Sequence, residues 1–159
     1  MKDDNFKKIT FKYFSDVLEE ETVETMWAEI IDTEKGIYKL DSIPFYGPLI
    51  ASDDIFYAKY DEDEKSLIFK EIIKSSGNSV VQIIVMKDDY DKEILRKKLL
   101  DLGCNSEGVN DKYFVTEILE KINYNSIKTL LDKYENEEII GYAEPILSLK
   151  HQDDISLED

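Results

Sequence analysis

The chain has 159 residues, of which 36 are acidic and 20 are basic, so its formal net charge is −16 at neutral pH. A field of this sign opposes binding to nucleic acid, whose phosphates have to be neutralised by basic side chains, and it equally disfavours anionic membranes. No apolar run approaches the roughly 20 residues of a membrane-spanning helix. We therefore expect neither nucleic acid nor a membrane as partner.

Size and cysteine content favour a small intracellular protein. The length suits one or two small domains, each able to bury a core. The N-terminus has no hydrophobic signal segment, and the single cysteine, Cys104, permits no internal disulfide. These features predict a cytoplasmic location, and nothing in the sequence specifies an oligomeric state.

Residues 1–77 are predicted to form a β-rich half. Alternating or β-branched composition predicts five strands, at residues 6–14, 22–31, 37–45, 54–60 and 66–74. Residues 32–36 supply a hairpin connection that ends in Gly36. Short strands at this spacing predict a small β-barrel or a strongly twisted antiparallel sheet.

Residues 78–149 are predicted to form a β-α-β-β-α-β unit, with strands at residues 79–86, 104–110, 113–119 and 139–147. The first strand reads as buried on both faces. A helix over residues 91–102 has Asp91 as N-cap and Gly103 at its C-terminal stop, and Asn123 or Asn125 caps a second helix. This order matches a ferredoxin-like arrangement, with both helices on one face of a four-stranded antiparallel sheet. The other sheet face is then left for solvent, for the first half or for a partner.

The predicted fold class is therefore α+β, with a barrel-like half followed by a ferredoxin-like half. Loop-forming residues 75–78 mark the boundary between the halves. Residues 150–159 are polar and acidic, and they are predicted to fray as a disordered tail.

Four short sequence segments resemble a bacterial family known as domain of unknown function 4265. They are residues 24–29 (ETMWAE), 36–45 (GIYKLDSIPF), 52–55 (SDDI) and 75–79 (SSGNS), and the resemblance runs to about Pro145. It implies a small bacterial cytoplasmic domain and transfers no activity.

The turn between the last two strands of the first half is the predicted partner-binding site. Tyrosines ringed by carboxylates suit a partner rich in Arg and Lys; the residues are Tyr57, Tyr60, Asp61, Glu62, Asp63 and Glu64. The alternative is a solvated hairpin turn. The segment lacks the Gly and Glu that a calcium loop requires, so no metal is expected.

Aromatic residues of the first half form a second candidate site. Trp27, Tyr38, Phe45 and Tyr46 could line a pocket, although such residues also form barrel cores. Residues 44–48 are either a recognition loop or a connection stiffened by proline.

Catalytic machinery is not evident in the sequence. His151, the one histidine, lies in the predicted tail, where a general base would be badly positioned. Cys104 follows a helix C-terminus, which raises a thiol pKa, and no histidine is near it in sequence. Nucleotide-binding glycine loops, nucleophile elbows and zinc spacings are missing. We predict a protein that is not an enzyme and has no cofactor, and only a pair of carboxylates remains as a catalytic alternative.

The resulting hypothesis is a non-enzymatic, acidic module that binds a basic protein. In its concrete form it is an immunity protein that neutralises a basic bacterial toxin. The alternative is a regulatory domain that senses a small molecule through its ferredoxin-like half, with a cleft between the halves near residues 44–48.

Overall fold

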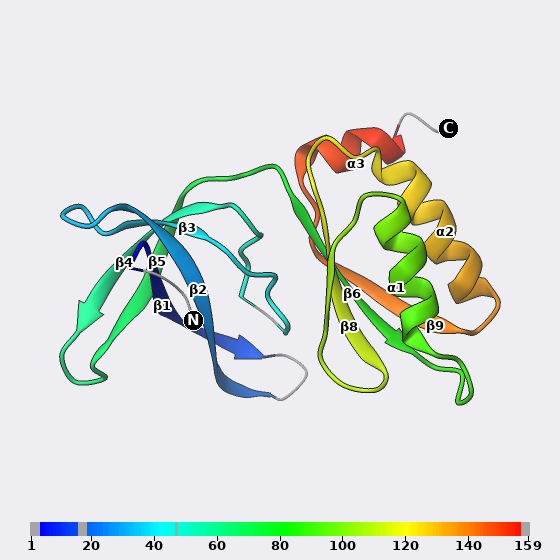
Figure 1. The fold of residues 1–159 in the computed structure, drawn as a ribbon, viewed down its shortest axis with the longest axis horizontal. Coiled ribbons are helices and arrows are strands. Elements are labelled where there is room, and N and C mark those ends of the chain that lie inside the picture. The colour runs from blue at the N-terminus through cyan, green and yellow to red at the C-terminus, as the bar shows by residue number, and fades with distance from the viewer. Residues whose placement is uncertain (1–3, 16–18, 47, 157–159) are drawn as a thin grey trace. The chain divides into compact units, whose positions relative to one another are not determined.

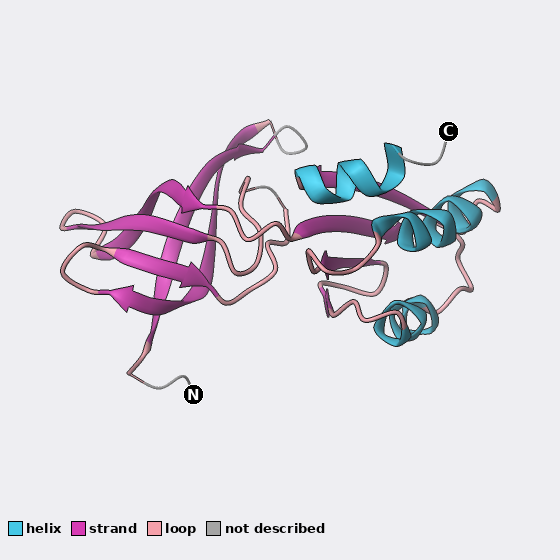
Figure 2. Cartoon of the chain, turned by 90° about the horizontal axis from the view of Figure 1, so that it is seen from above, coloured by secondary structure: helices cyan, strands magenta, loops and turns pink. Residues whose placement is uncertain are grey.

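A computed structural model describes residues 4–15, 19–46 and 48–156. The chain divides into two compact units, residues 1–76 and 77–159, and each is described by itself (Figure 1). Both units contain β-sheet, and all the helices of the described residues belong to the second unit, so the fold is of mixed α+β class (Figure 2).

The first unit is a closed five-stranded barrel. Its strands are β1 (Phe6–Ser15), β2 (Glu20–Asp32), β3 (Ile37–Leu40), β4 (Ile55–Asp61) and β5 (Ser66–Lys74). Consecutive strands pair antiparallel. A short parallel pairing of β1 with β5, through Ile9 and Leu67, closes the barrel.

The barrel core is built from side chains that alternate along the strands, as strand geometry requires. Phe56 lies at its centre, because its ring packs within 5.6 to 6.0 Å of the rings of Phe11, Tyr38 and Phe69. Other fully or nearly buried members are Ile9, Met26, Ala28, Leu40, Ile50 and Ala58.

The third strand is shorter than predicted, since β3 ends at Leu40 and not at Phe45. After Leu40 the chain turns away: Asp41 N–H donates to the Trp27 carbonyl, and Asp53 N–H donates back to the Leu40 carbonyl. Two prolines, Pro44 and Pro48, cannot donate to a ladder, and both are buried. The segment is thus a packed loop.

The second unit is a four-stranded sheet with three helices. Its elements are β6 (Ser79–Val85), α1 (Lys92–Asp101), β7 (Ser106–Gly108), β8 (Tyr113–Ile118), α2 (Tyr124–Asn136), β9 (Ile140–Ile146) and α3 (Leu149–Ser156). The strand order is β7-β8-β6-β9, and all neighbours are antiparallel. β9, which contains Pro145, is an edge strand, where a proline is tolerated.

Helices α1 and α2 cover one face of this sheet (Figure 1). Leu95 and Leu99 of α1 and Ile127 and Leu131 of α2 pack with alternate residues of β6 and β8 into one core. Both predicted helix starts are confirmed, because Asp91 accepts from Glu93 N–H and Asn123 accepts from Asn125 N–H. Gly103, with φ of 93°, follows α1 as expected.

One sequence prediction for this unit holds only in part, and another is wrong. β6 is buried on both faces at Val80 but not at Ile84, which is 45 % exposed on the face away from the helices. The predicted tail is not frayed through residue 156: it forms α3, and its His151 is fully buried. The helix was not predicted because the segment is polar and is held in place mainly by hydrogen bonds. Residues 157–159 lie outside the described part of the chain.

Candidate functional site

In the predicted partner-binding turn between β4 and β5, two of the four carboxylates already have partners within the chain. The carboxylate of Asp61 accepts hydrogen bonds from the backbone N–H groups of Asp63 and Glu64, at 2.8 and 3.1 Å. Glu64 forms an ion pair with Lys12. Glu62 and Asp63 are exposed, so these two carboxylates are the ones best placed to meet a partner.

The two tyrosines predicted for the same site lie on opposite faces of β4. Phe56 and Ala58 point into the barrel, so Tyr57 points outward and packs against Gly36. Tyr60 falls on the inward side at the end of the strand, where it is 54 % exposed. The structure therefore does not gather the two tyrosines and the turn into one surface.

The four aromatic residues predicted to line a pocket lie in different places: the barrel core, the outer face of β2 and the loop after β3. Tyr38 is part of the barrel core. Trp27 alternates with the buried Met26 and Ala28, so it lies on the outer face, with the Lys8 ammonium 5.4 Å from its ring centre. Phe45 and Tyr46 contact each other edge to face in the loop after β3.

The loop of residues 44–48 is anchored to β2. The carboxylate of Glu24 accepts from the N–H groups of Phe45 and Tyr46, at 2.6 and 3.1 Å, and from the Tyr13 hydroxyl at 3.3 Å. Burial, together with Glu24, raises the pKa of Tyr13 to about 12. One carboxylate thus holds the loop, whose Gly47 lies outside the described residues.

The side chains best suited to nucleophilic or acid–base chemistry are buried. Cys104 is fully buried in the core of the second unit, and burial, with a contribution from Glu117, raises its thiol pKa to about 11. The thiol is therefore protonated at neutral pH, which is the form without nucleophilic strength.

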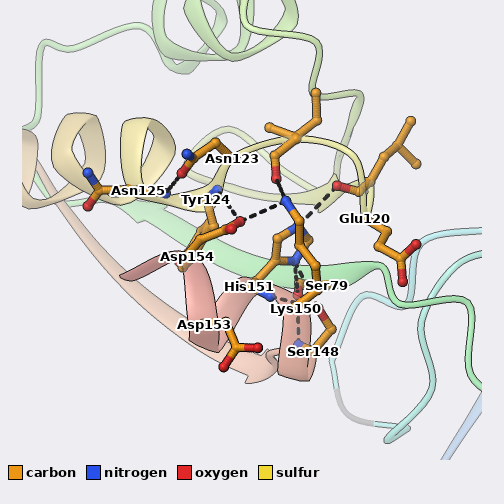
Figure 3. Close-up of polar contacts among 12 residues, drawn as sticks. Ser79, Glu120, Asn123, Tyr124, Asn125, Ser148, Lys150, His151, Asp153 and Asp154 are labelled. Carbon is orange, nitrogen blue, oxygen red and sulfur yellow. Dashed lines mark hydrogen bonds and ion pairs between the residues drawn. The ribbon is translucent and has the colours of Figure 1, made fainter. Parts of the chain in front are cut away.

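His151 lies at the centre of a buried polar cluster (Figure 3). Its Nδ1 is 2.6 Å from the Ser79 hydroxyl and 3.1 Å from the Ser148 hydroxyl, and its Nε2 is 3.0 Å from the Leu119 carbonyl oxygen. Ser79 resembles an activated serine in its contacts, yet it is fully buried. This hydroxyl–imidazole pair connects α3 to β6 and has no access to a substrate.

Tyr124 extends the cluster toward the edge of the sheet. Its ring lies 5.7 Å from that of His151, and its hydroxyl donates to Glu144. Nearby, the Tyr142 hydroxyl donates to Asp132 and accepts from Lys128. Burial, with the bond to Asp132, raises the pKa of Tyr142 to about 12. These contacts fasten α2 to β9.

Three loops at one end of the second unit are hydrogen-bonded to one another. The N–H groups of Met86 and Lys87 donate to the Ile139 carbonyl, and Val85 N–H donates to the Lys112 carbonyl. The Lys112 ammonium donates to the carbonyls of Lys87 and Asp88. We call this region the acidic end; its exposed carboxylates are Asp88, Asp89, Asp111, Glu135, Glu137 and Glu138. Met86, 61 % exposed, lies among them.

The negative charge is shared equally between the units. Residues 1–76 contain 18 acidic and 10 basic side chains, and residues 77–159 contain the same numbers, so each unit carries a net charge of −8. The β4–β5 turn is thus one acidic region among several. Sequence reasoning missed the acidic end because its carboxylates come from three separate segments.

The described residues contain neither a membrane-spanning helix nor a group of metal ligands. Within residues 4–15, 19–46 and 48–156, no helix is long and apolar enough to cross a membrane. In that same part of the chain, no three His, Cys, Asp or Glu side chains are grouped as a metal ion would need.

Comparisons with known proteins give one family and one fold. A family model described as a domain of unknown function, DUF4265, matches residues 24–142. A solved structure, described as the novel crystal structure of a hypothetical protein from Neisseria gonorrhoeae, is similar at a TM-score of 0.76 and 25 % identity, covering 89 % of this chain and 95 % of that one. No curated protein matches.

Proposed function

The chain belongs to the DUF4265 family, and we propose that it is a non-enzymatic binding module for a basic protein. The observation that carries this proposal is the acidic end. Five exposed carboxylates from three loops, and Glu135 from the last turn of α2, lie at this end together with the exposed Met86, and hydrogen bonds between the loops hold the surface in place before a partner arrives. A fixed surface reduces the ordering cost of binding.

Charge complementarity would make such a surface specific for a basic partner. Opposite fields speed association and disfavour acidic competitors, and both units of this chain are strongly negative. The burial of Cys104 and His151 supports a binding role over nucleophilic catalysis. The concrete form that we propose is an immunity protein that neutralises a basic bacterial toxin in the cytoplasm.

Affinity purification from the native cell, at low salt, tests the proposal. We expect a partner that is rich in Lys and Arg, that binds the purified chain directly, and whose affinity falls steeply as salt is added. Recovery of no such protein, or of a partner whose affinity is unaffected by salt, would overturn it.

Matched charge variants then locate the surface. We expect Asp89→Asn with Glu137→Gln, at the acidic end, to weaken binding by about tenfold, since each rim charge contributes modestly. Glu62→Gln with Asp63→Asn tests the β4–β5 turn, where the sequence placed the site. Glu34→Gln with Glu107→Gln removes the same charge from exposed positions elsewhere. Equal losses in all three pairs would indicate a nonspecific field and would contradict a defined surface.

A second candidate function is small-molecule sensing by the second unit. The order β7-β8-β6-β9 with α1 and α2 between strands supports a ferredoxin-like arrangement. An open hollow of about 440 Å³ lies beside α1 and β7. Arg96, which lines this hollow, already donates to Ser106 and Glu93. Because its hydrogen bonds are used within the chain, small-molecule sensing is the weaker of the two candidate functions. A metabolite that raises the melting temperature of the chain would support it, and a broad screen with no shift would remove it.

A further inference from the structure

Helix α3, eight residues long, is attached to the second unit by several polar side-chain contacts. Besides His151, Lys150 donates to the Ile122 carbonyl at 2.9 Å, and Asp154 accepts from Tyr124 N–H at 3.0 Å. Ile155 adds an apolar contact with the core. Figure 3 shows the side chains of Lys150, His151 and Asp154 converging from α3 on the start of β6 and the connection from β8 to α2.

The hydrogen-bond partners of His151 identify its protonation state. A backbone carbonyl only accepts, so the bond to Leu119 requires a hydrogen on Nε2. The Ser148 N–H donates to the Ser79 oxygen at 2.9 Å, which leaves the hydroxyl hydrogen of Ser79 free to point at Nδ1. The neutral imidazole with hydrogen on Nε2 therefore donates to the Leu119 carbonyl and accepts from the Ser79 hydroxyl at Nδ1.

A second proton on His151 would break this arrangement. Nδ1 would become a donor facing two hydroxyls, and the displaced Ser79 hydrogen would need a new acceptor in a fully buried position. The titratable groups that face the ring are the charged Lys150 and Asp154 from α3 and the neutral Tyr124 from α2. Asp154 acts on the ring and raises its pKa, but this carboxylate is also bonded to Lys150 and to Tyr124 N–H, so it offsets only part of the cost of burying an imidazolium.

We propose that α3 is a latch operated by pH, which the neutral His151 holds closed and its protonation opens. Opening withdraws Asp154 from the N-terminus of α2, where a carboxylate is favourable, and withdraws Lys150 from the Ile122 carbonyl. It also uncovers the core surface beneath Ile155. The latch does not depend on the proposed binding function.

The sign of the pH dependence follows from linkage. Burial lowers the pKa of His151 below its usual 6.5, with Lys150 acting in the same direction against the bond to Leu119. The open form therefore binds a proton more readily than the closed form. Closure is therefore most favourable above about pH 6.5, and the ratio of open to closed rises as the pH falls below that value toward the lower pKa of the closed form.

Nuclear magnetic resonance reads this titration directly, because His151 is the one histidine of the chain. We expect its ring signals to report hydrogen on Nε2 at pH 7.5 and to titrate below 6.5. Hydrogen exchange of the α3 amides, corrected for intrinsic rates, should increase several-fold relative to α1 amides between pH 7.5 and 5.0. Titration at or above 6.5, or α3 protection that is unchanged over this range, would overturn the proposal.

Three variants separate the latch from a merely structural helix. Ser79→Ala should raise the imidazole pKa toward 6.5 and weaken α3 protection at pH 7.5, whereas Ser126→Ala, an exposed serine of α2, should change neither. His151→Gln should abolish the pH dependence of α3 exchange. Persistence of that dependence in His151→Gln would assign it to another group and contradict the latch. If this variant does not fold, Ser79→Ala and the wild-type titration still decide.

Discussion

The two units carry the same net charge, yet they are held together differently. The barrel has an apolar core with Phe56 in contact with three other rings. The second unit combines an apolar core with buried hydrogen bonds, from Ser79 to His151 and from Tyr124 to Glu144, and the rings of His151 and Tyr124 contact each other between them. Apolar packing tolerates small rearrangements, whereas a hydrogen-bonded network permits a single arrangement. We infer that sensitivity to pH is concentrated in the second unit.

Each unit also fixes its own side of the boundary with a buried polar group. In the first unit, Asp54 accepts from Ala51 N–H and from Ser76 N–H, at 2.9 and 2.8 Å. In the second, Asn78 accepts from Glu120 N–H at 2.9 Å. The backbone is thus held in a defined conformation on each side of the boundary, at Ser76 and at Asn78. The units can be followed separately, because Trp27, the one tryptophan, is in the first and His151 is in the second.

Removal of the central barrel ring should have the largest effect. We expect Phe56→Ala to lower the free energy of unfolding of the first unit by about 3–5 kcal/mol, since it leaves a cavity among three rings. Urea unfolding followed by Trp27 fluorescence measures this. Phe14→Ala is the matched control: Phe14 is 60 % exposed, so its loss should cost less than about 1 kcal/mol. Similar losses in both would show that Phe56 is not the centre of the core.

Loss of the buried carboxylate should rank second. Asp54→Ala leaves the N–H groups of Ala51 and Ser76 without their acceptor, and we expect a cost of about 2–3 kcal/mol. The same fluorescence measurement applies. Asp63→Ala, at an exposed turn position, should change stability by less than about 0.5 kcal/mol. A smaller cost for Asp54→Ala than for Asp63→Ala would refute the role of this carboxylate at the boundary.

The regular elements could be predicted from the sequence because their signals are local. Alternation identified the barrel strands, and β5 was predicted with its observed bounds, Ser66–Lys74. Asp91, Gly103 and Asn123 marked the ends of helices through their own side chains or backbone freedom. Such signals operate within a few residues, so a single sequence contains them.

The polar clusters could not be predicted because their partners are distant in sequence. His151 bonds to Ser79 and Leu119, which lie 72 and 32 residues away. Residues 149–156 contain too few apolar side chains to form a helical stripe. The segment was therefore predicted to be a disordered tail. The anchoring of residues 44–48 by Glu24 was hidden for the same reason, since it spans 21 residues.

A glycine at the start of the second unit should be the next most sensitive position. Gly77 has φ of 85°, and a Cβ there would lie 2.0 Å from the Glu120 carboxylate. We expect Gly77→Ala to cost about 1–2 kcal/mol through backbone strain, with part of the clash relieved by movement of Glu120. Gly141→Ala is the control, because its Cβ would meet Ile84 at an ordinary 3.6 Å. Thermal unfolding followed by the His151 ring signals compares them, and equal melting temperatures would contradict the strain.

The smallest effect tests whether the polar network of the second unit extends to its edge strand. Tyr142→Phe removes a hydroxyl that bonds to Asp132 and Lys128, and we expect a cost of about 1 kcal/mol. Tyr60→Phe, at a tyrosine of the barrel that is 54 % exposed, should cost nothing measurable. Because the pKa of Tyr142 is raised from 10 to about 12, the stabilisation should be complete below pH 10 and lost as pH rises through 12. The difference between Tyr142→Phe and the wild type should therefore shrink in that window, measured by urea unfolding at pH 8 and pH 11. A difference that is constant with pH would mean that the hydroxyl acts only through packing.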